Sequence, residues 1–190
     1  MTFKRMYHSV RMLLSRGDYR KAKYLKKHNL LGGMGDNCKW GPWLLPLYPE
    51  LIVLHNNVCV HKTCHILTHD MIDAFLRRAM PDGGLVSGES LGPIEIGDNV
   101  YISMDAVIMP NVSIGNNCII SAGAIVTSDI PENSIVAGNP AKVVGRFDTY
   151  AAFRKMFNKN NPVFRNQYLP PEIAAEAWER FRKKHNRAKK

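Results

Sequence analysis

The chain has 190 residues, 45% of them hydrophobic and 22% charged, which is enough for one substantial domain but not for two large ones. No apolar run reaches the roughly 18 residues that span a bilayer, and the N-terminus lacks the features of a cleavable signal peptide. The four cysteines form no CxxC pair. We therefore expect a cytoplasmic protein with reduced thiols and no transmembrane segment.

The net charge of +10 is unevenly distributed. Residues 1–30 hold nine Lys or Arg against one Asp, residues 31–145 hold five against eleven acidic residues, and residues 146–190 hold twelve against four. Basic ends of this kind can attract nucleic acid or an anionic membrane surface. We expect solvated helical faces and no nucleic-acid partner, because no nucleic-acid motif is visible and aromatic residues do not alternate with the basic ones. Peripheral membrane contact stays open.

The first segment, residues 1–30, is helical in pattern. Residues 2–28 fit one or two basic amphipathic helices with a break near Gly17. We expect these helices to cover the open end of the domain that follows.

The second segment, residues 31–146, carries a six-residue repeat. Aliphatic residues stand at 96, 102, 108, 114, 120 and 126, with a small or apolar residue four places after each. The same period places aliphatic residues at 54, 60 and 66, and an insertion at 46–49 separates them from one further repeat at 34. A period of six is neither helical nor a plain strand alternation. It fits a chain that turns a corner every six residues, so that three sides make an 18-residue coil and the coils stack.

The residue types inside the repeat agree with a parallel β-helix. Asn and Gly in GDN, GNN and HNN suit corners that need a positive φ. The small inward positions include three cysteines that we expect to fill the core: Cys38, Cys64 and Cys118. The predicted fold class is therefore mainly β.

The segment HKTCHILTHD contains His61, His65 and His69. An extended chain places such residues about 13 Å apart in succession, whereas metal ligands converge on one ion at about 2 Å. We expect no metal site within one chain, although a metal shared between subunits stays open. His55 and His61 are interpreted as polar corners or subunit contacts.

The repeat fails between residues 71 and 93, where apolar residues first recur at helical spacing and Gly and Ser then dominate. We interpret this excursion as a loop that reaches over a neighbouring subunit and forms a binding pocket, with a subunit-packing arm as the alternative. The third segment, residues 147–190, predicts helices at 148–158 and about 171–185 before a basic tail. We expect them to cover the edges of the last coil.

The stretch from IGDNVY to NPAKVV and the segment ILTHD before the excursion resemble the hexapeptide-repeat acyltransferases, in particular their sugar O-acetyltransferase and xenobiotic acetyltransferase branches. The resemblance covers roughly residues 30–146. It implies a left-handed parallel β-helix with N-terminal and C-terminal helices. It also implies a homotrimer with the site between adjacent subunits, and acetyl-coenzyme A (acetyl-CoA) as the acyl donor.

The resemblance also implies site residues. The histidine of the family's T-H-D segment is the catalytic base, here His69. A neutral imidazole, with an ordinary pKa of about 6.5, suits that task. The repeat register turns Asp70 inward, so we interpret it as a corner residue or a contact to the acceptor substrate. Contacts to coenzyme A are expected from five positions, with Thr-Ser replacing the usual Thr-Lys: Met104, Ala122, Thr127, Ser128 and Lys142.

The expected activity is transfer of an acetyl group from acetyl-CoA to a hydroxyl of a small-molecule or saccharide acceptor, directly in a ternary complex. A donor such as a backbone N–H would stabilise the oxyanion. Two alternatives stay open: a metal-dependent hydratase like the β-helical carbonic anhydrases, and a non-catalytic scaffold subunit.

Overall fold

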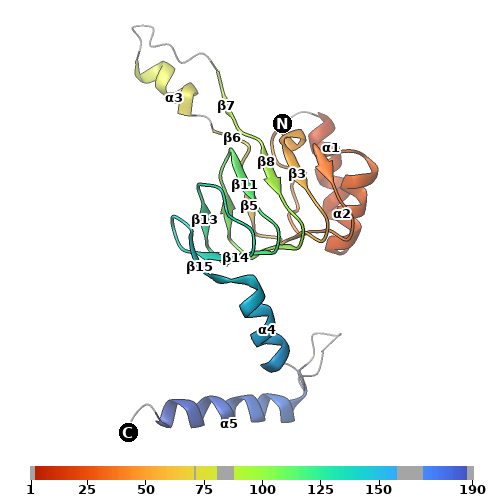
Figure 1. Cartoon of the computed structure of the whole chain (residues 1–190). Coiled ribbons are helices and arrows are strands. Elements are labelled where there is room, and N and C mark those ends of the chain that lie inside the picture. The colour runs from red at the N-terminus through yellow and green to blue at the C-terminus, as the bar shows by residue number, and fades with distance from the viewer. Residues whose placement is uncertain (1–2, 71, 81–87, 158–168, 188–190) are drawn as a thin grey trace. The chain divides into compact units, whose positions relative to one another are not determined.

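The computed structural model describes residues 3–70, 72–80, 88–157 and 169–187. The chain divides into two compact units, Met1–Ala152 and Phe153–Lys190, and the first unit contains the six-residue repeat (Figure 1). No helix among the described residues is long and apolar enough to cross a membrane.

The repeat folds into short strands that stack in three sheets. The first sheet contains, in spatial order, β1 (Gly33–Met34), β3 (Ile52–Leu54), β8 (Ile94–Ile96) and β11 (Val112–Ile114). The second contains β13 (Ile125–Val126), β10 (Val107–Ile108) and β5 (His65–Ile66). The third contains β15 (Lys142–Arg146), β14 (Ser134–Ala137), β12 (Cys118–Ile120), β9 (Val100–Ile102), β4 (Cys59–Val60) and β2 (Lys39–Trp40). All strand pairs within these sheets are parallel except β14 with β15.

From β8 to β13, consecutive strands lie in different sheets, and every third strand returns to the same sheet. β8, β9 and β10 occupy the three sheets in turn, and β11, β12 and β13 repeat the order directly against them. The register pairs Ile94 with Val112 and Val107 with Ile125, which are 18 residues apart. The predicted three-sided coil of 18 residues is therefore confirmed (Figure 1).

The core lies inside these stacked coils. The predicted aliphatic positions from residue 54 onward are all buried: Leu54, Val60, Ile66, Ile96, Ile102, Ile108, Ile114, Ile120 and Val126. Met34 in the first repeat is partly buried. The small positions are buried as well, and the three cysteines expected to fill the core do so: Cys38, Cys64 and Cys118. Burying an isoleucine side chain stabilises a fold by about 1.5–3 kcal/mol, so the repeat supplies most of the apolar driving force.

The corners are built on asparagine. Asn57, Asn99 and Asn117 all have φ of 56–58°, and their side-chain amides hydrogen-bond from coil to coil at 2.8 and 3.0 Å. The prediction that glycine also supplies positive φ in GDN and GNN is wrong for Gly97 and Gly115, which are not among the residues with positive φ. They are needed for close approach instead, since a Cβ on Gly115 would lie 2.6 Å from a backbone nitrogen of the next coil.

Two helices precede the first coil: α1 (Phe3–Leu14) and α2 (Asp18–Lys27). They are separated as predicted at Gly17, whose φ of 97° disfavours other residues. α2 packs against β1 and β2, and Met12 and Leu25 are fully buried. The buried Lys21 donates from Nζ to the Gly41 carbonyl at 2.7 Å, so α2 is hydrogen-bonded to the first coil as well as packed on it.

The chain leaves the coils at the predicted excursion. It passes through β6 (His69–Asp70) and α3 (Ile72–Ala79) and returns through β7 (Ser90–Leu91) (Figure 1). Parts of the predicted loop, residues 71 and 81–87, lie outside the described residues. The excursion lengthens the offset between paired strands, so that Ile52 pairs with Ile94.

The last coil ends differently from the prediction. The edge of β14 is covered by the antiparallel strand β15, whereas the sequence pattern had assigned the covering of the last coil to helices. The predicted C-terminal helices are present as α4 (Phe147–Phe157) and α5 (Pro171–Arg187). In α5, Trp178 packs edge-on against Phe181 with ring centroids 5.6 Å apart.

Candidate active site

His69 lies where the chain leaves the coils. The strand β6 pairs antiparallel with β7, with His69 opposite Leu91 and Asp70 opposite Ser90. The Gly92 backbone N–H donates to the Thr68 carbonyl at 2.8 Å and closes the base of this two-stranded ladder. The outgoing and returning arms of the excursion are therefore held together beside His69, whose side chain is half-buried.

The structure corrects the orientation predicted for Asp70. The repeat register turned this residue inward like Val58 and Cys64, but Asp70 is only half-buried. The register fails because the chain has already left the coil at Thr68 and pairs with β7 instead. The Asp70 carboxylate accepts a hydrogen bond from the Ile72 backbone N–H at 3.1 Å, so it satisfies one of the free N–H groups at the start of α3.

Tyr48 is the residue beside His69 that the repeat pattern did not identify. Its ring meets the imidazole edge to face, with centroids 5.5 Å apart and planes at 84°. Its hydroxyl donates to Glu89 on the returning arm of the excursion. Hydrogen bonding to the Glu89 carboxylate raises the pKa of Tyr48 and keeps the phenol protonated. Tyr48 thus connects the insertion before β3, the base candidate and the excursion.

The segment that carries Tyr48 is itself anchored next to His69. The hydroxyl of the buried Thr68 donates to the Leu47 carbonyl at 2.5 Å. Tyr48 adopts φ 49° and ψ 56°, a left-handed conformation that is unusual for a bulky residue and costs about 1–3 kcal/mol. Strain of this kind persists only where the surrounding contacts impose it, and here it directs the ring toward His69.

The His69 imidazole is incompletely hydrogen-bonded within one chain. Its Nδ1 atom is buried and has no hydrogen-bond partner among the described residues. A general base needs its second ring nitrogen held so that one tautomer and one ring orientation persist. Tyr48 restricts the ring by packing.

The structure divides the predicted coenzyme A contacts between the two ends of the second sheet. Thr127 and Ser128 directly follow β13, and the register places them two coils below Leu67 and Thr68. Two coils correspond to about 10 Å, so these exposed hydroxyls share an edge with the start of β6.

Two other predicted contacts lie at the opposite end of this sheet. Met104 and Ala122 occupy exposed corners one coil apart, where the Gly123 N–H donates to the Met104 carbonyl at 3.0 Å. Lys142 is exposed on β15 opposite Ala137. Its backbone neighbour Ala141 donates to the Ile125 carbonyl at 2.8 Å, which holds the start of β15 close to β13.

The remaining histidines make separate local contacts. His55 Nε2 lies 2.8 Å from Glu95 on the adjacent strand, and His61 Nδ1 lies 3.2 Å from Thr63. His65 is exposed on β5. In the part of the chain that the structure describes, no group of three His, Cys, Asp or Glu side chains gathers as metal ligands do.

Comparison with known proteins agrees with the repeat. Residues 93–128 match the family model described as bacterial transferase hexapeptide (six repeats). A Saccharomyces cerevisiae protein named "Putative acetyltransferase" is 54% identical over 52 residues, covering 27% of this chain and 26% of that protein. A Schizosaccharomyces pombe protein of the same name is 46% identical over 99 residues, covering 52% of this chain and 44% of that protein. The chain thus spans less than half the length of either curated relative.

Solved structures agree with the fold over most of the chain. A maltose O-acetyltransferase from Clostridium difficile 630 aligns with a TM-score of 0.52 at 25% identity, covering 75% of this chain and 85% of that one. A galactoside acetyltransferase in complex with coenzyme A aligns with a TM-score of 0.56 at 22% identity, covering 88% and 86%.

The fold is a β-helix that is similar to hexapeptide-repeat proteins, with a half-buried histidine at the point where the chain leaves the coils. The resemblance to the hexapeptide-repeat acyltransferases is confirmed by the repeat over residues 93–128 and by the fold over three quarters of the chain.

Proposed function

We propose that the protein is an acetyl-CoA-dependent O-acetyltransferase that acts on a hydroxyl of a sugar or saccharide acceptor, as a homotrimer of left-handed β-helices in the cytoplasm. The observation that carries the proposal is His69 on β6, at one edge of a hexapeptide β-helix that also presents Thr127 and Ser128. The similarity to a maltose O-acetyltransferase at 25% identity supports both the reaction and the acceptor class.

His69 acts as the general base in this proposal. The imidazole takes the proton of the acceptor hydroxyl as the oxygen attacks the thioester carbonyl, and the new C–O bond forms. The C–S bond then breaks, and the coenzyme A thiolate leaves and takes the proton. Because the acetyl group passes directly from donor to acceptor without an acyl-enzyme, donor, acceptor and base must be present together. Tyr48 serves as a positioning residue, since its ring packs on the imidazole, and Asp70 supports the start of α3 beside the acceptor.

The residues present fit coenzyme A as the donor substrate. Thr127 and Ser128 offer hydroxyls on the edge that leads to His69, and Lys142 offers an exposed ammonium suited to a phosphate. Met104 and Ala122 offer an exposed, largely apolar surface at the other end of the same sheet. A ligand as long as coenzyme A can contact both ends of a sheet. Two solved relatives of this fold are complexes with coenzyme A or acetyl-CoA.

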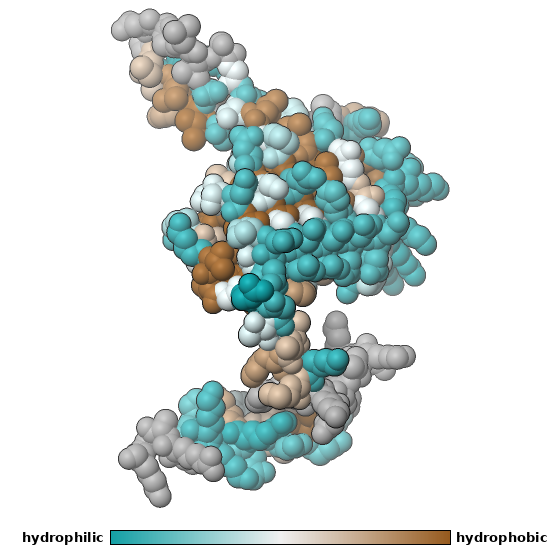
Figure 2. Space-filling view, viewed as in Figure 1, coloured by the Kyte–Doolittle hydropathy of each residue, from teal (hydrophilic) through white to brown (hydrophobic). Residues whose placement is uncertain are grey.

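A homotrimer accounts for two features of the single chain. The excursion exposes apolar side chains on α3, where Ile72 is 59% and Phe75 is 62% exposed, and Figure 2 shows hydrophobic surface over this helix. The buried Nδ1 of His69 lacks a partner among the described residues. A neighbouring subunit packed against the excursion would cover the exposed apolar side chains of α3 and can supply the hydrogen bond to His69 Nδ1.

Acetyl transfer can be measured directly. Purified protein with acetyl-CoA and a panel of saccharides should release the coenzyme A thiol in proportion to an O-acetylated product that mass spectrometry detects. Calorimetry should show binding of coenzyme A. Thiol release that requires an added divalent metal, or no binding of coenzyme A at all, would contradict the proposal.

A further inference from the structure

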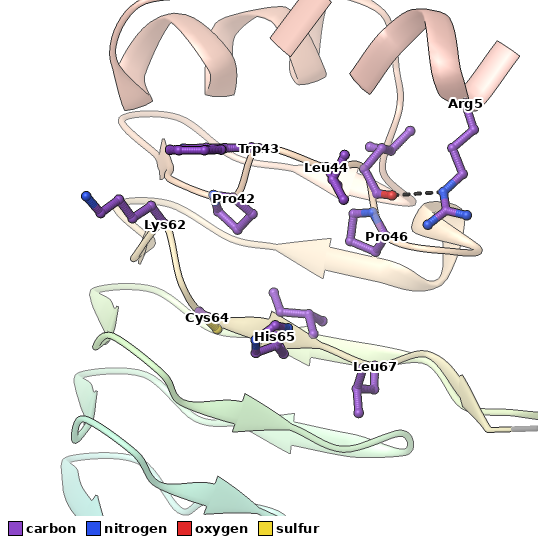
Figure 3. A pocket seen from close by; sticks show the side chains of 11 residues that line it. Arg5, Pro42, Trp43, Leu44, Pro46, Lys62, Cys64, His65 and Leu67 are labelled. Carbon is purple, nitrogen blue, oxygen red and sulfur yellow. Dashed lines mark hydrogen bonds between the residues drawn. The ribbon is translucent and has the colours of Figure 1, made fainter. Parts of the chain in front are cut away.

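A cavity of about 350 Å³ lies between the insertion that precedes β3 and the strand β5. β5 is the edge strand of its sheet, because the first coil contributes no strand there. The segment Pro42–Pro46 passes above this edge without pairing with it, and the space between them is the cavity (Figure 3). The insertion that interrupts the repeat therefore creates a cavity that regular coils do not have.

The lining of this cavity is apolar along its length and basic at its ends. Trp43 and Leu44 line it although they are 55% and 66% exposed, so they contribute little to the core. Figure 3 shows Lys62 at the Trp43 end and Arg5 at the opposite end. His65 lies between them, and none of the eleven residues that line the cavity is acidic.

Arg5 is held at its end of the cavity by the backbone of the insertion. Its Nε–H donates to the Leu45 carbonyl at 2.9 Å (Figure 3). The contact brings the basic helix α1 to the cavity wall and holds the guanidinium group there. A guanidinium held in this way suits a carboxylate or a phosphate, whose oxygens match its geometry.

The cavity lies directly beside the proposed base. Leu67 lines it, and His69 follows two residues later, a distance of about 7 Å along an extended chain. A second cavity of about 470 Å³ shares Arg5 and Leu45 with the first and extends to Tyr48, whose ring packs on His69. A ligand in the first cavity can therefore present a neighbouring group to the base.

The one thiol among the residues that line the cavity, Cys64, is not suited to act as a nucleophile or a metal ligand. Cys64 lines the cavity, but burial raises its pKa to about 12. A thiol that stays protonated near neutral pH is a poor nucleophile and a poor metal ligand. The cavity is thus built for binding rather than for covalent chemistry.

We propose that this cavity is a subsite for an acidic saccharide, in which an aromatic wall at Trp43 packs on a sugar ring and Arg5 and Lys62 bind carboxylate or phosphate groups on the sugars. The inference rests on the proposed acetyl transfer and specifies its acceptor as a negatively charged saccharide. It also gives the basic helix α1 a role in binding beyond covering the first coil.

The test compares acidic and neutral sugars of the same ring. Calorimetric titration with galacturonate, galactose 6-phosphate and galactose should show that at least one acidic sugar binds about tenfold or more tightly than galactose, which corresponds to about 1.4 kcal/mol. Binding should weaken as salt is added, because ions screen the attraction between the anionic sugar and the guanidinium and ammonium groups. The carboxylate and phosphate arms show which anion the site prefers. If all three sugars bind equally, or if none of them binds, the inference is overturned.

Variants identify the site. Arg5→Gln should remove the preference for the acidic sugar, whereas Arg11→Gln removes a charge from the same helix outside the cavity and should leave it intact. Trp43→Ala should weaken the binding of acidic and neutral sugars alike, and Trp43→Phe should retain most of the wild-type affinity. Circular dichroism confirms that each variant is folded. An acidic preference that survives Arg5→Gln, or displacement of galacturonate by coenzyme A, overturns the inference.

The same samples separate this inference from the proposed function. If acetyl transfer to other acceptors proceeds while the sugar preference is absent, the subsite is wrong and the transferase stands. If acidic sugars bind through Arg5 but thiol release from acetyl-CoA is absent with every acceptor, the subsite stands and the transferase is wrong.

Discussion

Replacing Thr68 by valine tests whether the segment that carries Tyr48 is anchored as the structure indicates. Thr68 is 1% exposed and its hydroxyl donates to the Leu47 carbonyl at 2.5 Å. Valine has nearly the same volume, so Thr68→Val removes the hydrogen bond without leaving a cavity. The Leu47 carbonyl then loses its partner in a partly buried position.

The expected loss of stability follows from that unpaired carbonyl. An unsatisfied buried acceptor costs about 1–3 kcal/mol, and for a chain of this size each kcal/mol lowers the Tm by about 2–4 °C. Urea unfolding at pH 7, followed by circular dichroism at one fixed protein concentration, measures the change. Acetyl transfer should also decline, because Tyr48 is no longer held against His69.

Thr68→Ser is the matched control, because it keeps the hydroxyl and deletes only a methyl group. The serine variant should be more stable than the valine variant despite its smaller side chain. If Thr68→Val unfolds at the wild-type urea concentration, or is more stable than Thr68→Ser, the hydrogen bond to Leu47 is not an anchor and the reasoning fails.

Three further predictions concern two glycines, a buried cysteine and the assembly of the chain. Gly41→Ala should destabilise the fold by about 1–3 kcal/mol, because the new Cβ would lie 2.3 Å from the Lys62 backbone nitrogen; Gly88→Ala, with open space around it, should change stability by less than about 0.5 kcal/mol. Ellman's reagent at pH 8 should modify the buried Cys64 only after denaturation, since burial raises the pKa of the folded thiol from the ordinary 9.0 to about 12. The free energy of unfolding should therefore hold below pH 9 and decline toward pH 12, because the thiol ionises more readily in the unfolded chain over that range. Light scattering at micromolar concentration should give three times 21.5 kDa, and a monomer would rule out a site shared between subunits.

The coils could be predicted from the sequence because each position in them has one environment. The aliphatic residue at every sixth position must enter the core, since the stacked sides leave no other place for it. Ile96, Ile108 and Ile120 are all buried. The corners follow similarly from asparagine, as at Asn99. Glycine at the corners was misinterpreted because a close approach and a positive φ favour the same residue.

The surroundings of His69 could not be predicted in the same way. Tyr48 reaches the imidazole from an aperiodic insertion, and no local pattern indicates a contact between residues 21 positions apart. The positive φ of Tyr48 is likewise imposed by its surroundings, because tyrosine has no preference for it. Asp70 was expected to face inward because the repeat was extended past the point where β7 replaces the next coil as the pairing partner.

The most direct test of the proposed mechanism is the rate of acetyl transfer by His69→Ala on an acceptor that the wild-type enzyme uses. Loss of a general base lowers the rate by about 10²- to 10⁴-fold, while coenzyme A affinity should change little because the proposed contacts lie on later coils. His55→Ala, whose partner is Glu95 on the neighbouring strand, should lose less than about tenfold. A His69→Ala enzyme that is folded, binds coenzyme A and retains most of the wild-type rate would show that the base lies elsewhere.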